Sequence, residues 1–267
     1  MILDLIKRNV ADYLQEHELS LKIVDAVVGY FYTIVVTEDE DGEKYIGLNI
    51  TPSFEISDIL ERRNNPKFYP SIQEEIELLT SESWIERSLA LATINSLSQK
   101  LLRFQRVNNT NEWIIRKLYD VRSSKVAIIG NMPPVIRELK KYFVVYTFDK
   151  KLCGNVMSES LEKRVLPQVD AVVMSGAVII NESIDEILEY ARNSKLNIII
   201  GPSAQIHPMF IKGVKIHYLG STAIINNKEE AVQLLKLGYT RGVFYDSKYS
   251  VQYFVSNEDS FTTSTEQ

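Results

Sequence analysis

The sequence predicts an α/β protein with a Rossmann-like parallel sheet over residues 121–255 and an N-terminal α+β domain over residues 1–120. Three observations predict it. Short β-branched runs alternate with helical stretches after about residue 121, which is typical of parallel strands covered by helices. Several of these runs end abruptly in small and polar residues. The first half instead combines helices with a hairpin pattern, and residues 256–267 form a polar stretch expected to fray.

The N-terminal part begins with a helix, because apolar residues recur at near-helical spacing from Leu3 to Leu14. Residues 23–36 are predicted to be extended, with a break at Gly29-Tyr30. A polar turn that ends at Gly42 then leads into a return strand over 44–50, so we expect a β-hairpin or meander. The later helical patterns of this part cover residues 72–79, 84–102 and 112–119.

The C-terminal part repeats the strand–helix alternation. The strands are predicted at residues 125–129, 144–148, 170–174, 197–200 and 215–219, and the helices at residues 133–141, 158–165, 184–192 and 228–236. Aromatic residues at positions 244, 245, 249, 253 and 254 are predicted to form either a core strand or a contact between subunits of a homo-oligomer.

Composition and charge exclude several classes of protein. The chain has 267 residues, a net charge of −5 and a pI near 5.4, which argues against a large nucleic-acid surface because phosphate binding needs clustered Lys and Arg. No apolar run approaches the roughly 20 residues that cross a bilayer, so no membrane partner is expected. Cys153 is the sole cysteine, which excludes an intramolecular disulfide and fits a cytoplasmic location.

Polar and glycine residues follow three of the predicted strands. Gly130-Asn131 follows the first, Ser175-Gly176 the third, and Gly201-Pro202-Ser203 the fourth. The carboxyl ends of parallel strands form one edge of the sheet, and open α/β folds bind their ligands there. The sequence therefore predicts a binding crevice with these residues on its floor.

The first two strand ends leave alternatives open. A dinucleotide site would show G-x-G-x-x-G after the first strand, whereas this chain has Gly130 followed by two prolines, so orthodox NAD binding is disfavoured. Amides at that helix start could still hold an anion. Asp149 ends the second strand, where it is predicted either to accept a ribose hydroxyl or to terminate the strand in a turn.

The third and fourth strand ends carry further candidates. Asn181 or Ser183 is expected to cap the helix near residue 184, while Glu182 and the other residue face the crevice. Ser203 with His207 four residues later has the residue types of a nucleophile and a base, but not the G-x-S-x-G pattern of hydrolases. Glu182 and His207 are the candidate metal ligands.

One candidate comes from the N-terminal domain. Asn95 is a polar residue in the apolar, small-residue helix pattern of residues 88–97. Small residues allow a helix to approach another backbone or a ligand closely. Asn95 is therefore expected either to pair with a neighbouring loop or to reach the ligand from the second domain.

Together these motifs resemble a prokaryotic family named for a conjectured role in heavy-metal chelation. Its members join an enolase-N-terminal-like domain to a Rossmann-like domain. The resemblance is carried by the turn over 130–133, by Ser175-Gly176 to Asn181, by the Gly-Pro-Ser loop over 201–203, and by the helix over 92–97. It implies this two-domain fold and a metal or metal-bearing ligand in the cleft between the domains.

The resulting functional prediction is the binding of a small polar or anionic ligand, metal-bearing in one version, in the interdomain crevice. The alternative is a transferase that uses a nucleotide or S-adenosylmethionine, which Asp149 favours and the missing glycine fingerprint opposes. No residue set has the spacing of a known catalytic centre. The expected partners are thus a small molecule or a metal, and a second copy of the chain if the C-terminal aromatics form a subunit contact.

Overall fold

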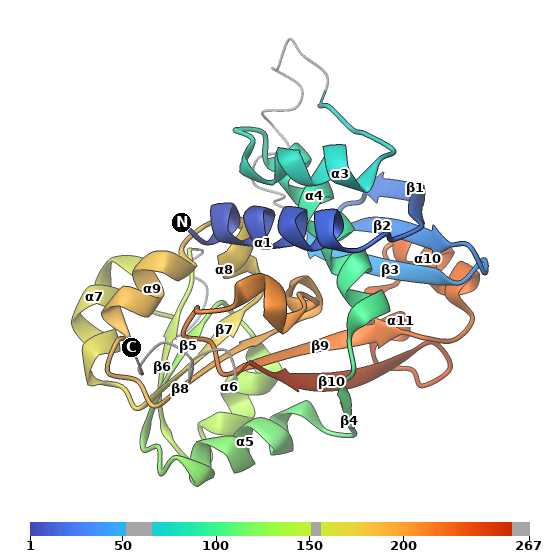
Figure 1. Cartoon of the computed structure of the whole chain (residues 1–267). Coiled ribbons are helices and arrows are strands. Elements are labelled where there is room, and N and C mark those ends of the chain that lie inside the picture. The colour runs from blue at the N-terminus through green and yellow to red at the C-terminus, as the bar shows by residue number, and fades with distance from the viewer. Residues whose placement is uncertain (52–65, 151–155, 258–267) are drawn as a thin grey trace.

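The structure of the protein, a computed structural model, describes residues 1–51, 66–150 and 156–257. Two β-sheets with helices around them make up this part of the chain (Figure 1). A large sheet lies below a small sheet in this view, and helices α1 (Ile2–Glu16) and α4 (Trp84–Leu101) lie between or beside them. The predicted fold class, a Rossmann-like sheet joined to an N-terminal α+β unit, is confirmed.

The large sheet has seven strands in the order β4-β10-β9-β8-β7-β5-β6. The five strands from β5 to β9 are parallel, whereas β10 runs antiparallel to both β9 and β4. The strands are β4 (Gln105–Val107), β5 (Lys125–Ile129), β6 (Val144–Phe148), β7 (Ala171–Ser175), β8 (Leu196–Ile200), β9 (Tyr218–Ile224) and β10 (Ser250–Ser256). The apolar residues of the central parallel strands β5, β7, β8 and β9 are buried on both faces, as expected for parallel strands covered by helices, whereas the edge strands β4 and β6 are partly exposed.

The order of the parallel strands identifies a switch point. Numbered along the chain, they are arranged 2-1-3-4-5, so the chain leaves β5 first toward β6 on one side and then toward β7 on the other. In doubly wound folds of this order, ligands bind outside the carboxyl ends of the two strands at which the direction reverses. That position lies at the ends of β5 and β7.

The small sheet is the predicted meander. It consists of β1 (Leu21–Val28), β2 (Tyr32–Asp39) and β3 (Lys44–Ile50), all antiparallel, and the return strand has the predicted bounds. Helix α4 packs on one face of this sheet through β2 and β3. Helices α10 (Lys228–Lys236) and α11 (Thr240–Phe244) contribute to the core on its other face.

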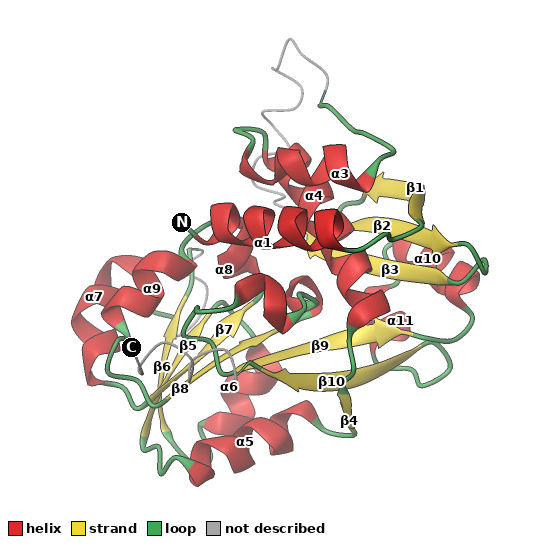
Figure 2. Ribbon diagram, viewed as in Figure 1, coloured by secondary structure: helices red, strands yellow, loops and turns green. Residues whose placement is uncertain are grey.

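The helices form layers on both faces of the large sheet (Figure 2). Helices α5 (Thr110–Asp120) and α6 (Pro133–Leu139) cover one face. The other face shares a core with α1, α4, α8 (Ala177–Ile180) and α9 (Ile184–Tyr190). The shorter helices are α3 (Ile72–Glu75), α7 (Glu162–Val165) and the 3₁₀ segments η2 (Ile76–Thr80), η3 (Glu159–Leu161), η4 (Leu166–Gln168), η5 (Pro202–Ala204) and η6 (Pro208–Ile211). In the described part of the chain, no helix is both long enough and apolar enough to cross a membrane.

Two elements bear on the predicted domain limits. Strand β4 and helix α5 precede residue 120, yet β4 pairs with β10, and α5 packs on the large sheet through Trp113, Ile114 and Leu118. The N-terminal helices α1 and α4 share a core with that same sheet. The two units therefore interlock, and the boundary at residue 120 stays a prediction.

The C-terminal strands differ in detail from the prediction. The strand expected at residues 215–219 begins only at Tyr218 and continues to Ile224. The preceding residues are tied to Asn197 by a mixture of bonds. The Asn197 side-chain amide donates to the Lys215 carbonyl, His217 Nδ1 accepts the Asn197 N–H, and the His217 N–H donates to the Asn197 carbonyl.

Four of the five C-terminal aromatic residues are buried, and Tyr253 and Phe254 lie in the core strand β10. Tyr245 alone among the five is exposed, so a subunit contact stays a prediction for that residue. Asn257, which belongs to the predicted tail, is buried and donates to the Ile216 carbonyl at 2.8 Å. Residues 258–267 lie outside the described residues.

Candidate functional site

The three predicted strand-end loops meet at the carboxyl edge of the large sheet. Gly130 has a φ of +99°, and a Cβ atom built on it would lie 2.8 Å from the Cβ of Ser175. A Cβ atom on Gly176 would lie 2.9 Å from the Cβ of Ser203. Glycine is required at both positions because the neighbouring loop leaves no room for a side chain. The loops after β5, β7 and β8 are thus packed directly against one another.

Asp149 stabilises the turn after β5. Its Oδ2 accepts the N–H of Asn131 at 2.7 Å, which ties the end of β6 to the end of β5. This contact belongs to the turn after β5, whereas the sequence predicts that Asp149 terminates its own strand in a turn or contacts a ribose hydroxyl, so the strand-terminating role stays a prediction. A role toward a ribose hydroxyl stays a prediction, and so does the transferase that would need it.

The Gly201-Pro202-Ser203 loop holds the small sheet. Ser203 is buried, and its Oγ accepts the N–H of Ile50 at 2.8 Å. Asn95 on α4 is completely buried, and its side-chain amide donates to the Leu48 carbonyl at 2.7 Å and to the Ser203 carbonyl at 3.3 Å. Of the two roles considered for Asn95, pairing with a loop is therefore present. Both side chains join strand β3 to the loop after β8.

Gln205 completes this junction, and the sequence analysis did not single it out. Its Oε1 accepts the N–H of Leu48 at 2.8 Å, and its Nε2 donates to the Thr222 carbonyl at 2.8 Å. All three residues are buried. The position of an amide two residues after Ser203 is the only sequence signal for it. Gln205 links the edge of the small sheet to β9 of the large sheet.

Gln205→Ala is expected to lower the free energy of unfolding by about 2 kcal/mol, because it leaves the buried Leu48 N–H and Thr222 carbonyl without their partner. Urea denaturation of both proteins measures the loss. Gln168→Ala is the matched control: this glutamine is exposed and makes one contact, to the Arg164 carbonyl. Equal stabilities of the two variants would contradict a structural role of Gln205.

An ion pair joins the turn between α8 and α9 to helix α4. Arg87 Nη1 lies 2.5 Å from Glu182 Oε1, and the guanidinium lies over the Trp84 ring, 4.2 Å from its centroid. Arg87 is only 8% exposed, and its Nε is buried without a hydrogen-bond partner in the described part of the chain. A charged group is rarely buried unless all its donors are used. Arg87 is a second residue of this region that local sequence patterns do not reveal, because its only signal is a cation in the first turn of a helix whose centre is rich in small and apolar residues.

Glu182 is held in an unusual backbone conformation. Its φ is +61°, in the left-handed region that non-glycine residues seldom adopt. Such conformations persist where the surrounding structure determines them, and they are frequent at binding sites. The turn before Glu182 ends α8, and the turn after it begins α9.

Asn181 and Ser183 bond to each other rather than to helix α9. Asn181 Oδ1 accepts the N–H of Ser183 at 3.0 Å and its hydroxyl at 2.8 Å. Ser183 occupies the N-cap position, but its side chain makes no capping hydrogen bond. The predicted capping by one of these residues is therefore wrong, because their side chains satisfy each other within the turn that carries Glu182.

His207 forms a local hydrogen bond at the start of a 3₁₀ segment and does not pair with Ser203. His207 Nδ1 accepts the N–H of Met209 at 3.2 Å at the start of η6, and burial lowers the pKa of the imidazole. No hydrogen bond joins it to Ser203, whose Oγ is used by Ile50, so the residues do not form a nucleophile–base pair in the described structure. Glu182 is engaged by Arg87.

The described residues contain no group of three or more His, Cys, Asp or Glu side chains that could hold a metal ion. Cys153 lies outside the described residues. Soft heavy metals are bound by closely set thiolate and imidazole ligands, and His207 and Glu182 lack such companions here. The side chains of residues 1–51, 66–150 and 156–257 therefore do not fit a protein-built heavy-metal site.

Two family models match the chain. DUF364, with the description "Putative heavy-metal chelation", matches residues 116–253, and DUF4213, with the same description, matches residues 11–98. An uncharacterized protein of Methanocaldococcus jannaschii is 32% identical over 265 residues, covering 94% of this chain and 98% of the relative.

Two solved structures are similar over almost their full length. The crystal structure of a protein of unknown function from the DUF364 family of Pyrococcus horikoshii has a TM-score of 0.82 and 34% identity, and the match covers 96% of this chain and 100% of that one. A DUF364 protein of unknown function from Desulfitobacterium hafniense has a TM-score of 0.70 and 16% identity, with 94% and 98% covered, and this likeness shows the fold alone.

Proposed function

The chain belongs to the DUF364 family, and from that premise we propose that it binds a small anionic ligand, a carboxylate or a phosphate, at the Arg87–Glu182 pair. The observation that carries this proposal is a buried arginine with an unused donor, paired across the two units with a glutamate in a left-handed backbone conformation.

The chemistry of Arg87 supports an anion. The guanidinium is a planar fork of donors that matches two oxygens of a carboxylate or phosphate. Glu182 occupies one side of this fork through Nη1, and the Trp84 ring covers its face. The buried Nε has no partner in the described residues, so an incoming oxygen would satisfy a donor that is otherwise costly to bury.

The position of the pair supports a ligand site. Glu182 lies in the turn between α8 and α9, and α8 directly follows β7, one of the two strands at the switch point. Arg87 comes from α4 of the other unit. We keep three further residues as flanks of the proposed site. Ser175 ends β7 and Asn131 follows β5 at the carboxyl edge, while Asn181 precedes Glu182 in the turn after α8. Asn95 and Ser203 are left out, because their polar atoms already join the loop to β3.

The heavy-metal description of the family fits this site only if the metal arrives inside the ligand. The described residues supply one carboxylate here and no cluster of donors. An anionic metal complex would be recognised by Arg87 through its carboxylate or phosphate oxygens. In that case the free metal ion binds weakly and its anionic complex binds well.

The test compares two substitutions with opposite expected effects. Titration calorimetry with citrate, inorganic phosphate, zinc chloride and zinc citrate first identifies an anion that binds. Arg87→Lys is then expected to weaken its binding at least tenfold, because lysine keeps the charge and loses the fork. Glu182→Gln is expected to tighten its binding, because it removes the carboxylate that competes for Arg87.

Arg137→Lys is the matched control, since Arg137 is an exposed arginine on α6 and should leave binding unchanged. Circular dichroism and melting curves of each variant show that it is folded. The absence of saturable binding for every anion tested would refute the proposal. Weaker rather than tighter binding by Glu182→Gln would also refute it, because the pair would then be structural.

A further inference from the structure

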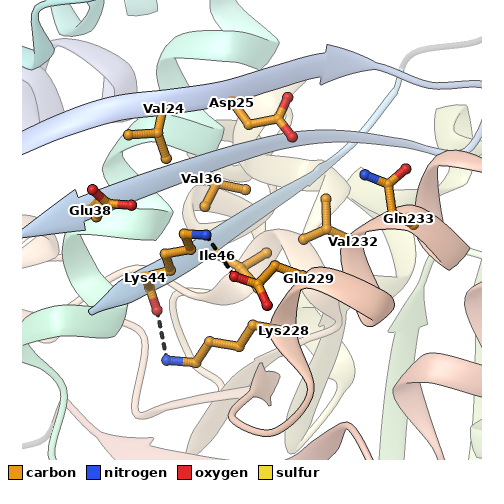
Figure 3. A pocket seen from close by; sticks show the side chains of 10 residues that line it. All are labelled: Val24, Asp25, Val36, Glu38, Lys44, Ile46, Lys228, Glu229, Val232 and Gln233. Atoms are coloured by element: carbon orange, nitrogen blue, oxygen red, sulfur yellow. Dashed lines mark hydrogen bonds and ion pairs between the residues drawn. The ribbon is translucent and has the colours of Figure 1, made fainter. Parts of the chain in front are cut away.

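A second cavity lies outside the carboxyl edge, between the small sheet and helix α10 (Figure 3). Its volume is about 230 Å³. Its lining includes the aliphatic residues Val24, Val36, Ile46 and Val232 and the lysines Lys44 and Lys228. They come from all three strands of the small sheet and from α10, so both units of the chain form its walls.

The floor of this cavity is aliphatic. Val24, Val36 and Ile46 from the sheet face Val232 from α10 (Figure 3). Val24 lies at a β-bulge, where the register between β1 and β2 shifts and Val24 itself has no partner on β2. A bulge redirects a side chain out of the regular pleat. Val24 is 42% exposed, although it stands beside the buried Val36 and Val232.

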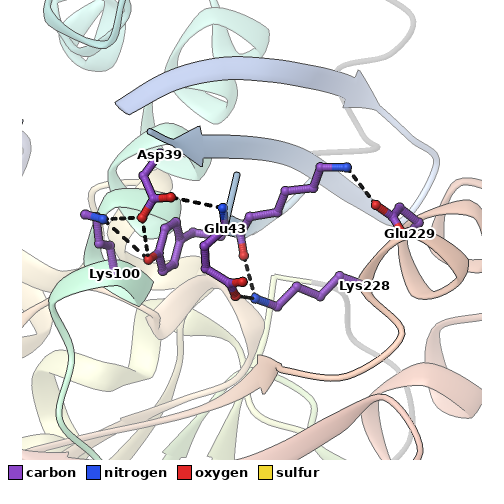
Figure 4. Close-up of polar contacts among 7 residues, drawn as sticks. Asp39, Glu43, Lys100, Lys228 and Glu229 are labelled. Atoms are coloured by element: carbon purple, nitrogen blue, oxygen red, sulfur yellow. Dashed lines mark hydrogen bonds and ion pairs between the residues drawn. The ribbon is translucent and has the colours of Figure 1, made fainter. Parts of the chain in front are cut away.

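The rim carries charges of both signs. Lys44 Nζ lies 2.7 Å from Glu229 Oε1, and Lys228 contacts Glu43 and donates to the Lys44 carbonyl at 2.7 Å (Figure 4). Lys44 and Lys228 are the lysines among the lining residues, and three acids line the cavity beside them. Asp25 is paired with Lys236 at 2.6 Å, and Glu38 with Lys22 at 3.4 Å.

The acids paired with the two rim lysines are mostly in solvent. The side chain of Glu229 is 81% exposed and that of Glu43 is 57% exposed, whereas the lysines are more covered. Exposed ion pairs contribute little to stability, so an incoming carboxylate can replace these partners at small cost. The two lysines are thus available to an anion that also fills the aliphatic floor.

We propose that this cavity binds an apolar α-amino acid, with its carboxylate on Lys44 and Lys228, its ammonium toward Glu38, and its aliphatic chain on Val24, Val36 and Val232. The volume suits a ligand smaller than the drug-sized molecules that occupy pockets of about 300–1,000 Å³. Both signs of charge on one rim favour a zwitterion over a simple anion or amine. This inference is independent of the Arg87 site.

Occupancy should stabilise the whole chain. The ligand contacts the small sheet and α10 together, so it binds the folded protein and not the unfolded one. A ligand of this kind raises the free energy of unfolding by RT ln(1 + L/Kd), where L is the ligand concentration, so the melting temperature rises with the logarithm of the ligand concentration once it exceeds the dissociation constant. Binding is therefore visible both by calorimetry and by thermal denaturation.

The experiment titrates the full-length protein with L-leucine and with three analogues that each lack one feature. Isoamylamine lacks the carboxylate, 4-methylpentanoate lacks the ammonium, and glycine lacks the aliphatic chain. L-leucine is expected to bind saturably, and each analogue is expected to bind with at least tenfold lower affinity. Lys44→Gln should lower the affinity for L-leucine at least tenfold. Lys141→Gln, which removes a lysine from another surface ion pair, should leave this affinity unchanged.

Three outcomes would overturn the proposal: no saturable binding of L-leucine, L-valine or L-isoleucine, equal binding of L-leucine and 4-methylpentanoate, or unchanged binding after Lys44→Gln. Lys44 is a partly exposed rim residue whose ammonium pairs with an exposed glutamate, so its variant is expected to fold. Arg87→Lys should leave L-leucine binding unchanged, which separates a failure of this site from a failure of the anion site.

Discussion

Gly47→Ala is expected to destabilise the protein by more than about 4 kcal/mol or to prevent folding. A Cβ atom built on Gly47 would lie 1.9 Å from the carbonyl oxygen of Ala92 and 2.3 Å from the backbone nitrogen of Ser96. Both are main-chain atoms of α4, so no rotation of a side chain can relieve the overlap. The substitution would force β3 away from α4 and so disturb the junction made by Asn95 and Gln205.

Chemical denaturation of wild-type and variant protein measures this effect, and soluble expression gives a first indication. Gly242→Ala is the matched control, because a Cβ atom there would have nothing within 4 Å. Gly242 lies in the short helix α11, where alanine is favoured over glycine by about 1 kcal/mol, so the control should be neutral or slightly stabilising. Near-wild-type stability of Gly47→Ala would contradict the close approach of β3 and α4.

The environment of Gly47 shows how far the sequence predicts the structure around α4. The small residues of 88–97 predict that this helix approaches another backbone or a ligand closely, and the structure shows that the close neighbour is the backbone of β3. The pattern identifies the close approach because side-chain size is local information. It does not identify the partner, because Gly47 and Ala92 are brought together only by tertiary packing.

At the carboxyl edge of the large sheet, too, the sequence predicts which segments meet but not the contacts that they make. The alternation of strands and helices predicts where the strand-end loops meet, and the structure confirms the meeting of Gly130 with Ser175 and of Gly176 with Ser203. The hydrogen-bond partners of these loops could not be predicted from local sequence patterns, because the partners lie far away along the chain. Ser203 bonds to Ile50, 153 positions away, and Glu182 pairs with Arg87, 95 positions away. A polar side chain at a strand end therefore indicates a ligand site only if it is not already used in a structural contact with a distant part of the chain.

Glu75→Gln is expected to stabilise the protein at pH 8 by about 3 kcal/mol and to leave it nearly unchanged near pH 4. Glu75 is completely buried, and its Oε2 accepts the N–H of Tyr69 at 2.7 Å, while its Oε1 has no hydrogen-bond partner in the described structure. Burial, and to a smaller extent the charge of Glu86, raises the pKa of this carboxyl from 4.5 to about 7, although the hydrogen bond from Tyr69 opposes the rise.

The sign of the effect follows from proton binding. Between pH 4.5 and 7 the folded protein holds a proton on Glu75 that the unfolded chain has released, so the free energy of unfolding falls as the pH rises through this range. Above pH 7 the buried carboxylate is charged and its full cost is present. Glutamine imitates the protonated acid, since its Oε1 can accept the Tyr69 N–H and its amide carries no charge.

Urea denaturation at half-unit steps from pH 4 to pH 8 compares the two proteins. The difference in free energy of unfolding should grow mainly between pH 4.5 and 7, and then level off. Glu74→Gln is the control at the neighbouring exposed position, and its profile should run parallel to that of the wild type. A constant difference between Glu75→Gln and wild type across the whole range would show that Glu75 does not titrate as a buried acid.

Glu162, on a different helix, provides an independent test of the effect of burial on the pKa of a carboxyl group. It is buried at the start of α7, its Oε1 also lacks a partner in the described residues, and burial together with Glu159 and Glu186 raises its pKa to about 7. Glu162→Gln should therefore remove a second part of the pH dependence over the same range. Because the two acids belong to separate elements, their effects should add, so the double variant should be the least sensitive to pH.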